Sequence, residues 1–271
     1  MIGAMIGDVV GSVYEAHNIK TKDFPLLSPR SNYTDDTLMS LAVADALLAL
    51  KEGMDFRKTL IRTMQGIAEE YSCPMGGYGG RFYRWLQEAD PQPYNSYGNG
   101  SAMRVSPCGE YAKTLEEALR LAKESAEVSH NHPEGVKGAQ ATAAAVWMAK
   151  HGASKQEIRD YITAHFYRLD QTVDQIRPAY DFDISCQGTV PPAIICFLES
   201  DSFEDALRNA ISLGGDSDTL ADITCAIAWP FYARQGEDKT MNMLRLRMME
   251  LLPPYLREIM EKWEKTYGQP A

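Results

Sequence analysis

Residues 2–16 read IGAMIGDVVGSVYEA, and this stretch does most to decide the fold. Its apolar side chains recur at helical spacing, which predicts a helix. Three glycines fall four residues apart on one face of that helix, namely Gly3, Gly7 and Gly11. Each glycine costs a helix about 1 kcal/mol relative to alanine. The stripe therefore predicts a face on which another helix or a ligand comes close to the backbone.

Helical periodicity continues along the chain, whereas strand signals are nearly absent. The one short alternation, at 180–186, is expected to be a loop, because a single strand cannot make a sheet. No Pro/Ser-rich linker divides the sequence. We therefore expect a compact single all-α domain over residues 1–271. Its further helices are expected at 34–52, 55–71, 114–130, 133–152, from Ser154 onward, and at 189–200, 202–212, 218–233, 237–250 and 254–267.

The charge balance excludes several function classes. The chain has 27 Lys and Arg against 37 Asp and Glu, a net charge of −10 and no basic stretch, so stable nucleic-acid binding is not expected. Its five scattered cysteines favour a reducing cytoplasm over a disulfide framework. Residues 1–10 make a poor signal peptide, and the best apolar run, 38–50, is too short to cross a bilayer. We expect a cytoplasmic protein without a membrane partner.

Two acidic clusters carry the strongest chemical signal, and each begins a predicted helix. The first is Thr34-Asp35-Asp36-Thr37, which alone is explained by an N-cap threonine and first-turn aspartates that complement the helix dipole. The second, Gly214-Gly-Asp-Ser-Asp-Thr219, again pairs carboxylates with a hydroxyl residue. Facing each other, the two clusters have the oxygen ligands that two hard divalent cations require. Carboxylates crowded that way repel one another, and cations relieve the repulsion.

Two loops are candidate ligand-binding segments. Residues 17–33, 72–80 and 90–100 are the longest irregular stretches, and such stretches are often functional. The glycines of Ser96-Tyr-Gly-Asn-Gly-Ser-Ala-Met-Arg104 allow the main chain to aim N–H groups at phosphate, although a plain turn before a short helix explains them equally well. In the segment from Ser129 to Gly135, spacing alone favours a solvated or helix-capping role for both histidines.

Taken in order, the motifs resemble those of the ADP-ribosylglycohydrolases, the family that includes dinitrogenase reductase-activating glycohydrolase and the mammalian ADP-ribosyl hydrolases. Single motifs are weak, but the ordered set is specific and spans most of the chain. The Ser129-His130 pair and the alanine-rich helix after it also fit. The four ordered motifs are Gly7–Glu15, Tyr33–Thr37, Ser96–Pro107 and Gly214–Thr219.

The resemblance implies an all-helical fold with two Mg²⁺ or Mn²⁺ ions in a central cleft. Glu15, by default a surface residue, matches a family glutamate on a mobile loop near the metals, and Glu15 and Asp36 become the candidate catalytic residues. The metal ligands would be Thr34, Asp35, Asp36, Asp216, Asp218 and Thr219. The ADP-ribose-binding residues would be Ser96, Tyr97, Gly98, Asn99, Gly100, Ser101, Met103 and His130.

The implied reaction is hydrolysis of the glycosidic bond at C1″ of the distal ribose. It releases ADP-ribose from a modified protein, nucleic-acid base or metabolite, with an arginine-linked acceptor favoured and a serine-linked one also open. The run after Asp218 departs from the glycine- and alanine-rich family pattern and ends in Trp229-Pro230, which leaves the substrate open. A monomer is favoured.

Two alternative functions remain at this stage. One is a catalytically inactive ADP-ribose-binding protein on the same fold. The other is a phosphatase of the haloacid dehalogenase type, because Asp216-Ser-Asp-Thr-Leu220 resembles its Asp-x-Asp signature. That second chemistry needs the motif to follow a buried strand of a parallel sheet.

Overall fold

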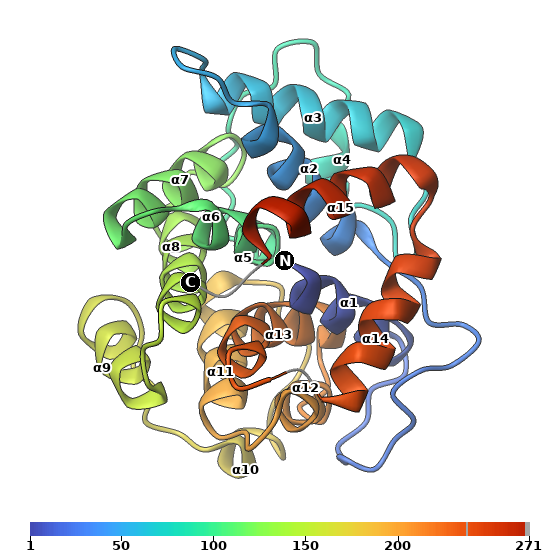
Figure 1. Ribbon diagram of the computed structural model, residues 1–271, viewed down its shortest axis with the longest axis vertical. Coiled ribbons are helices and arrows are strands. Elements are labelled where there is room, and N and C mark those ends of the chain that lie inside the picture. The colour runs from blue at the N-terminus through green and yellow to red at the C-terminus, as the bar shows by residue number, and fades with distance from the viewer. Residues whose placement is uncertain (237, 269–271) are drawn as a thin grey trace.

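The computed structural model describes residues 1–236 and 238–268 and is built from helices (Figure 1). Residue 237, where one helix was expected to begin, and residues 269–271 lie outside the described part. The helices are α1 (Ile2–Glu15), α2 (Asp35–Ala49), α3 (Phe56–Glu70), α4 (Gly80–Leu86), α5 (Gly100–Met103), α6 (Ser106–Tyr111), α7 (Leu115–Glu127), α8 (Pro133–Lys150), α9 (Lys155–His165), α10 (Val173–Ile176), α11 (Cys186–Leu198), α12 (Phe203–Ile211), α13 (Ser217–Ala233), α14 (Lys239–Leu251) and α15 (Pro254–Tyr267).

The all-α prediction is confirmed, because the described residues form no β-strand. Their only extended pairings are two isolated bridges, one between Thr34 and Met75 and one between Gly98 and Ser185. The acidic motif at Asp216 follows helix α12 rather than a strand. The phosphatase alternative is therefore wrong. None of the described helices combines the length and the hydropathy needed to cross a membrane.

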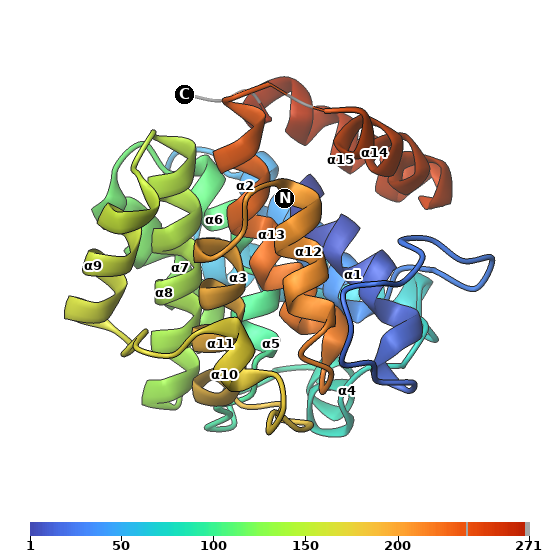
Figure 2. The same ribbon diagram turned by 90° about the horizontal axis from the view of Figure 1, so that it is seen from below.

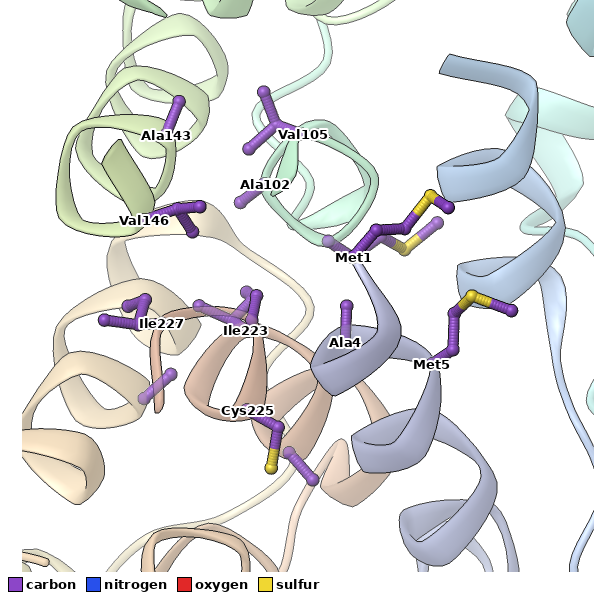
Figure 3. Packing of buried hydrophobic residues seen from close by; sticks show 14 of the residues in the cluster. Met1, Ala4, Met5, Ala102, Val105, Ala143, Val146, Ile223, Cys225 and Ile227 are labelled. Carbon is purple, nitrogen blue, oxygen red and sulfur yellow. The ribbon is translucent and has the colours of Figure 1, made fainter. Parts of the chain in front are cut away.

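Helix α13 forms the centre of the fold. It packs against α1, α8, α11 and α12 and is buried along most of its length (Figure 1). Helices α14 and α15 lie across one end of the molecule (Figure 2). The buried apolar side chains form one cluster, in which Ala4 of α1, Val146 of α8 and Ile223 of α13 point toward the same interior (Figure 3). The centre of the fold is therefore a helix whose N-terminus carries the second acidic cluster.

The glycine stripe of α1 contacts α13 backbone to backbone. A Cβ atom added at Gly3 would lie 2.2 Å from the carbonyl oxygen of Cys225, and one at Gly11 would lie 2.5 Å from the Cα atom of Asp218, with equal crowding at Gly7. The predicted close approach is thus confirmed as a helix–helix contact. Because the partner positions run backwards, the two helices are antiparallel. The C-terminal end of α1 is therefore held beside the N-terminal end of α13.

The structure differs from the sequence expectation in its short elements. Helices α4, α6 and α10 were not expected, because four to seven residues give too few turns for a periodic pattern. Helix α11 begins at Cys186, three residues before the expected start, although Pro191 and Pro192 lie inside it. Its start is set by Ser185, whose side chain accepts a hydrogen bond from the Gly188 backbone N–H.

Candidate functional site

A turn of two glycines starts helix α13 and directs its acidic residues. Gly214 and Gly215 both have φ of +70°, the left-handed region that favours glycine. The Asn18 side chain holds this turn from both sides, since its Nδ2 donates to the Gly215 carbonyl at 2.9 Å and its Oδ1 accepts from the Gly215 N–H at 2.7 Å. The turn places Asp216 and Asp218 at the N-terminal end of α13, beside the C-terminal end of α1.

Glu15 lies beside these aspartates because it is the last residue of α1. Each of Glu15, Asp216 and Asp218 offers one carboxylate oxygen, and these oxygens all lie within 4.8 Å of one another. Glu15 is half-buried and belongs to a helix end rather than to a loop. Three carboxylates from positions 200 residues apart in sequence thus converge to the size of a cation site.

The N-terminus of α2 is fixed by Asp8, a residue that the sequence analysis did not select. The fully buried Asp8 carboxylate accepts from the Thr34 N–H at 2.9 Å, the Thr34 hydroxyl at 2.8 Å and the Thr37 N–H at 3.1 Å. Thr34 in turn caps α2 by accepting from the Asp36 N–H at 3.2 Å. The available signal was a charged residue inside the apolar stripe of α1.

The two acidic clusters meet across the cleft. The Thr219 hydroxyl donates to the Asp36 carboxylate at 2.8 Å, which joins the first turn of α13 to the first turn of α2. Thr34 is therefore both the N-cap of α2 and a neighbour of this site. The first cluster therefore caps helix α2 and also lines the candidate site, so the two explanations of its residues do not exclude each other.

Burial and mutual repulsion make these carboxylates hard to ionise. Burial raises the pKa of Asp35 to about 8, and among the neighbouring charges Asp8 adds most to this shift. Burial raises the pKa of Asp36 and of Asp218 well above the usual range, and a facing carboxylate adds to each shift, Asp218 for Asp36 and Asp216 for Asp218. The pKa of Glu15 is raised by burial and then by Asp216. Divalent cations would remove this electrostatic cost.

The loop before α5 forms the next wall of the site. The Asn99 amide donates to the Asp216 carboxylate at 2.7 Å, and the Asn99 backbone N–H donates to the Ile184 carbonyl at 2.7 Å. Gly98 forms its bridge with Ser185 in the same place. The loop is thus anchored between the acidic cluster and the segment before α11.

His130 lies in this site, and its expected solvated or capping role is wrong. The ring is 5% exposed, and burial, followed by the charges of Arg104 and Arg81, lowers the pKa of His130 well below its usual range. His132 does cap a helix, because its side chain accepts from the Glu134 N–H at 3.1 Å at the start of α8. Sequence spacing alone could not distinguish the role of His130 from that of His132.

These walls enclose a cleft of about 530 Å³, within the usual size range of small-molecule sites. All predicted site residues except Ser101 line it. The Ser101 hydroxyl lies behind the loop and donates to the Gly135 carbonyl at 2.8 Å. The predicted residues that line the cleft are Glu15, Thr34, Asp35, Asp36, Ser96, Tyr97, Gly98, Asn99, Gly100, Met103, His130, Asp216, Asp218 and Thr219.

A second group of lining residues was not predicted individually. Most of them come from the irregular stretch 72–80 and its continuation to Phe82, and the rest are Tyr94, Arg104, Phe182 and Ile184. Part of the stretch 72–80 therefore lies at the cleft, whereas no residue of 17–33 lines it. Met75 and Gly76 lie beside the carboxylates, since Met75 forms a bridge with Thr34 and a Cβ atom added at Gly76 would lie 3.5 Å from Oε2 of Glu15. The charges of Arg104 and Arg81 act instead on His130. The residues of this second group are Met75, Gly76, Gly77, Tyr78, Gly79, Gly80, Arg81, Phe82, Tyr94, Arg104, Phe182 and Ile184.

An all-helical fold with a cleft lined both by clustered carboxylates and by Arg81, Arg104 and His130 defines a class of ligand-binding site suited to divalent cations and a polar, anionic substrate. The family profile described as ADP-ribosylglycohydrolase matches residues 1–228. The chain therefore belongs to the ADP-ribosylglycohydrolase family, a class of hydrolases that act on glycosidic linkages of ADP-ribose.

Individual relatives agree with this assignment. The chain is 28% identical to ADP-ribosylhydrolase ARH3 of Mus musculus, over 87% of this chain and 83% of the relative. It is 26% identical to ADP-ribosylarginine hydrolase Tri1 of Pseudomonas putida (strain GB-1), over 87% and 70%. A solved structure described as an ADP-ribosylglycohydrolase-related protein complex superposes with a TM-score of 0.65 at 22% identity, covering 92% of this chain and 96% of that chain, and so supports the fold.

Proposed function

We propose that this chain is a single-domain, metal-dependent hydrolase that cleaves the bond between ADP-ribose and a modified acceptor and releases ADP-ribose. The observation that carries the proposal is the convergence of carboxylate oxygens of Glu15, Asp216 and Asp218 within 4.8 Å, in a cleft that Arg81 and Arg104 also line. Family membership supplies the substrate class. The cleft and its carboxylates support a hydrolytic reaction that uses divalent cations.

The residues present fit a pair of divalent cations. The donors are carboxylate and hydroxyl oxygens, which hard cations prefer, and no lysine or arginine neutralises the acidic clusters of the cleft among the lining residues described. The ligands would be Thr34, Asp35, Asp36, Asp216, Asp218 and Thr219, with Mg²⁺ or Mn²⁺ as the ions. When bound, such ions orient ribose hydroxyls and lower the pKa of a water molecule.

Glu15 and Asp36 are the candidates for the proton acceptor of the reaction. One oxygen of Asp36 already accepts from the Thr219 hydroxyl at 2.8 Å, whereas Glu15 is half-buried at the cleft wall and its raised pKa suits a general base. We favour Glu15. The carboxylate would take a proton from water as the water oxygen bonds to C1″. The bond from C1″ to the acceptor would break with its electron pair going to the acceptor atom, which would then receive that proton. The neighbouring carboxylates stabilise the positive charge that develops on the ribose.

The part of the cleft at the loop from Ser96 to Gly100 would hold the rest of ADP-ribose. The backbone from Ser96 to Gly100 faces the cleft without large side chains in its way, except at Tyr97. Arg81 and Arg104 add positive charge to the cleft, which suits a diphosphate. This arrangement sets the distal ribose against the carboxylates.

For the acceptor, we favour an arginine side chain. The acidic clusters of the cleft attract a cationic group, and one relative is named for ADP-ribosylarginine hydrolysis. Serine-linked ADP-ribose is the nearest competing substrate.

The deciding experiment incubates the purified chain with arginine-linked and serine-linked ADP-ribosyl peptides, each with Mg²⁺, with Mn²⁺ and with EDTA. We expect release of free ADP-ribose from the arginine peptide only when a cation is present. Tight ADP-ribose binding without product from either peptide would instead support the inactive binding protein.

Two single substitutions test the metal scheme. Asp36→Ala and Asp216→Ala should each abolish turnover and weaken Mn²⁺ binding while circular dichroism shows unchanged helicity. Asp45→Ala provides a matched control, because Asp45 lies further along α2 and does not line the cleft. Retained turnover in both cleft variants would rule out the two-cation site.

A further inference from the structure

Arg104 is a buried cation without a carboxylate partner. Its side chain is 1% exposed, and none of the ion pairs among the described residues includes it. Its Nε atom has no hydrogen-bond partner. Burial lowers the pKa of Arg104 to about 10, so the group stays charged at neutral pH. A buried charge of this kind is costly, and such groups persist where the site needs them.

The guanidinium group is nevertheless held in one orientation. Its Nη2 atom donates to the Ser125 backbone carbonyl at 2.7 Å and to the Ser129 hydroxyl oxygen at 2.9 Å, and the charged group lies 5.7 Å from the centre of the Phe82 ring. The Ser129 hydroxyl oxygen lies 2.8 Å from Nδ1 of His130. Arg104, Ser129 and His130 thus form one continuous chain of hydrogen bonds.

The direction of this chain follows from counting protons. Arginine has no lone pair to offer, so Ser129 must accept from Arg104. The single proton of the fully buried Ser129 hydroxyl then points to Nδ1 of His130, because the described residues offer it no other acceptor. Nδ1 is therefore the acceptor, and the proton of a neutral imidazole must sit on Nε2.

The Nε2 atom points to the ligand side. A Cβ atom added at Gly98 or Gly100 would lie 3.5 or 3.4 Å from it, so it faces the glycine loop directly. The ring is also confined by Phe82 and Tyr94, whose centroids lie 6.4 and 5.7 Å away. His130 therefore presents one N–H donor to the cleft in a fixed direction.

We propose that Arg104 is a positioning residue that acts through Ser129 to hold His130 as the Nε2–H tautomer, so that His130 donates a hydrogen bond to an oxygen of the diphosphate–ribose part of the ligand. This inference rests on the proposed function. Arg104 itself does not touch the reacting atoms. Its second effect is a positive potential beneath the glycine loop.

The first test needs no ligand. Nitrogen NMR of ¹⁵N-histidine-labelled protein distinguishes the two neutral tautomers, and the His130→Gln variant assigns the signal among the five histidines. The wild type should show His130 protonated on Nε2. In Ser129→Ala the signal should move to a mixture of tautomers. A wild-type His130 protonated on Nδ1 would overturn the proposal.

The second test is calorimetric titration with ADP-ribose. Ser129→Ala should weaken binding on the order of tenfold, the worth of about one hydrogen bond. Arg104→Lys should weaken ADP-ribose binding similarly, because lysine keeps the positive charge but lacks the planar guanidinium whose N–H donors point in fixed directions. His130→Gln should retain more affinity than His130→Ala, since the glutamine amide can replace the Nε2–H donor.

Ser125→Ala is the matched control. Ser125 is buried close by, but it contacts Arg104 only through its backbone carbonyl, and its own hydroxyl has no partner. Its affinity for ADP-ribose should stay within about twofold of wild type. Unchanged affinity in Ser129→Ala and Arg104→Lys would overturn the proposal. A wild type that does not bind ADP-ribose would defeat the proposed function instead, and the tautomer in the free protein would still decide the inference.

Discussion

Asp8 shows how one side chain connects helix packing to the site. It lies on the buried face of α1 and accepts three hydrogen bonds from Thr34 and Thr37. Those bonds use donors that the start of α2 would otherwise leave unsatisfied. Asp35 and Asp36 are the next residues of that helix. The position of two proposed ligands therefore depends on an aspartate that does not line the cleft.

Asp8→Asn should destabilise the fold and weaken Mn²⁺ binding together. The amide can accept with only one of its two ends, so we expect a loss of about 1–3 kcal/mol in the free energy of unfolding. Urea unfolding and calorimetric titration measure the two effects. Asp45→Asn is the control, because Asp45 is part-buried on the same helix as Asp35 and Asp36 but does not line the cleft. An unchanged Mn²⁺ affinity in Asp8→Asn would contradict the argument.

His130 should make the protein less stable in acid. Its folded-state pKa is lowered by burial and by Arg104 and Arg81. Below pH 6.5, the unfolded chain therefore binds a proton that the folded chain does not, and stability falls as pH falls. Relative to His130→Gln, the wild type should lose up to about 1.4 kcal/mol per pH unit in this range. Urea unfolding between pH 7.5 and pH 5 gives the comparison.

The same curves for His165→Gln, an exposed position on α9, serve as the control. Parallel wild-type and His130→Gln profiles would show that His130 takes up its proton in the folded state.

At the scale of elements, the long helices could be predicted and their partners could not. Thr114 and Ser154 begin helices as their capping patterns indicate, and the stripe from Gly3 to Gly11 correctly indicated a close approach. Nothing in the local pattern named α13 as the partner of α1. That choice depends on complementary surfaces formed by residues some 200 positions apart, which short-range periodicity does not contain.

Gly7→Ala should be strongly destabilising. Its Cβ would lie 2.2 Å from the Ala221 carbonyl oxygen, which belongs to helix backbone and cannot turn aside. We expect at least about 3 kcal/mol lost from the free energy of unfolding, by urea titration. Gly66→Ala in α3 is the control, because nothing lies within 4 Å of its added Cβ, and it should be neutral or stabilising by up to about 1 kcal/mol. A tolerated Gly7→Ala would contradict the close helix contact.

At the scale of the whole molecule, the site lies where three helix ends meet: the C-terminus of α1 and the N-termini of α2 and α13. The carboxylates there could be predicted because two clusters of paired acids with a hydroxyl residue occur in the order of the family motifs. A pair of acids at a helix start is by itself ordinary, as Glu116 and Glu117 of α7 show. Arg81, Phe82 and Tyr94 could not be predicted, since single arginines and aromatics are common on surfaces and in cores. Only folding brings them to the same cleft.

Cations should stabilise the whole fold by binding to this meeting point. Mg²⁺ or Mn²⁺ at about 100 times its dissociation constant should add about 2.7 kcal/mol to the free energy of unfolding and raise the Tm. EDTA should reverse the effect, and Asp216→Ala should remove it. Thermal unfolding followed by circular dichroism measures each case. An equal rise in Asp216→Ala would place the bound ion elsewhere.

The antiparallel contact of α1 and α13 also fixes the position of Glu15 relative to Asp218 along the helix axis. Its spacing comes from main-chain atoms, so the height of Glu15 over Asp218 is set by residue number rather than by any side chain between them. One residue inserted after Gly11 would shift Glu15 by about 1.5 Å along the axis and turn it about 100° around it. The residues of α1 from Ile2 to Ser12 are also all buried, so packing limits the side chains along this helix while the position of Glu15 limits its length beyond the last glycine.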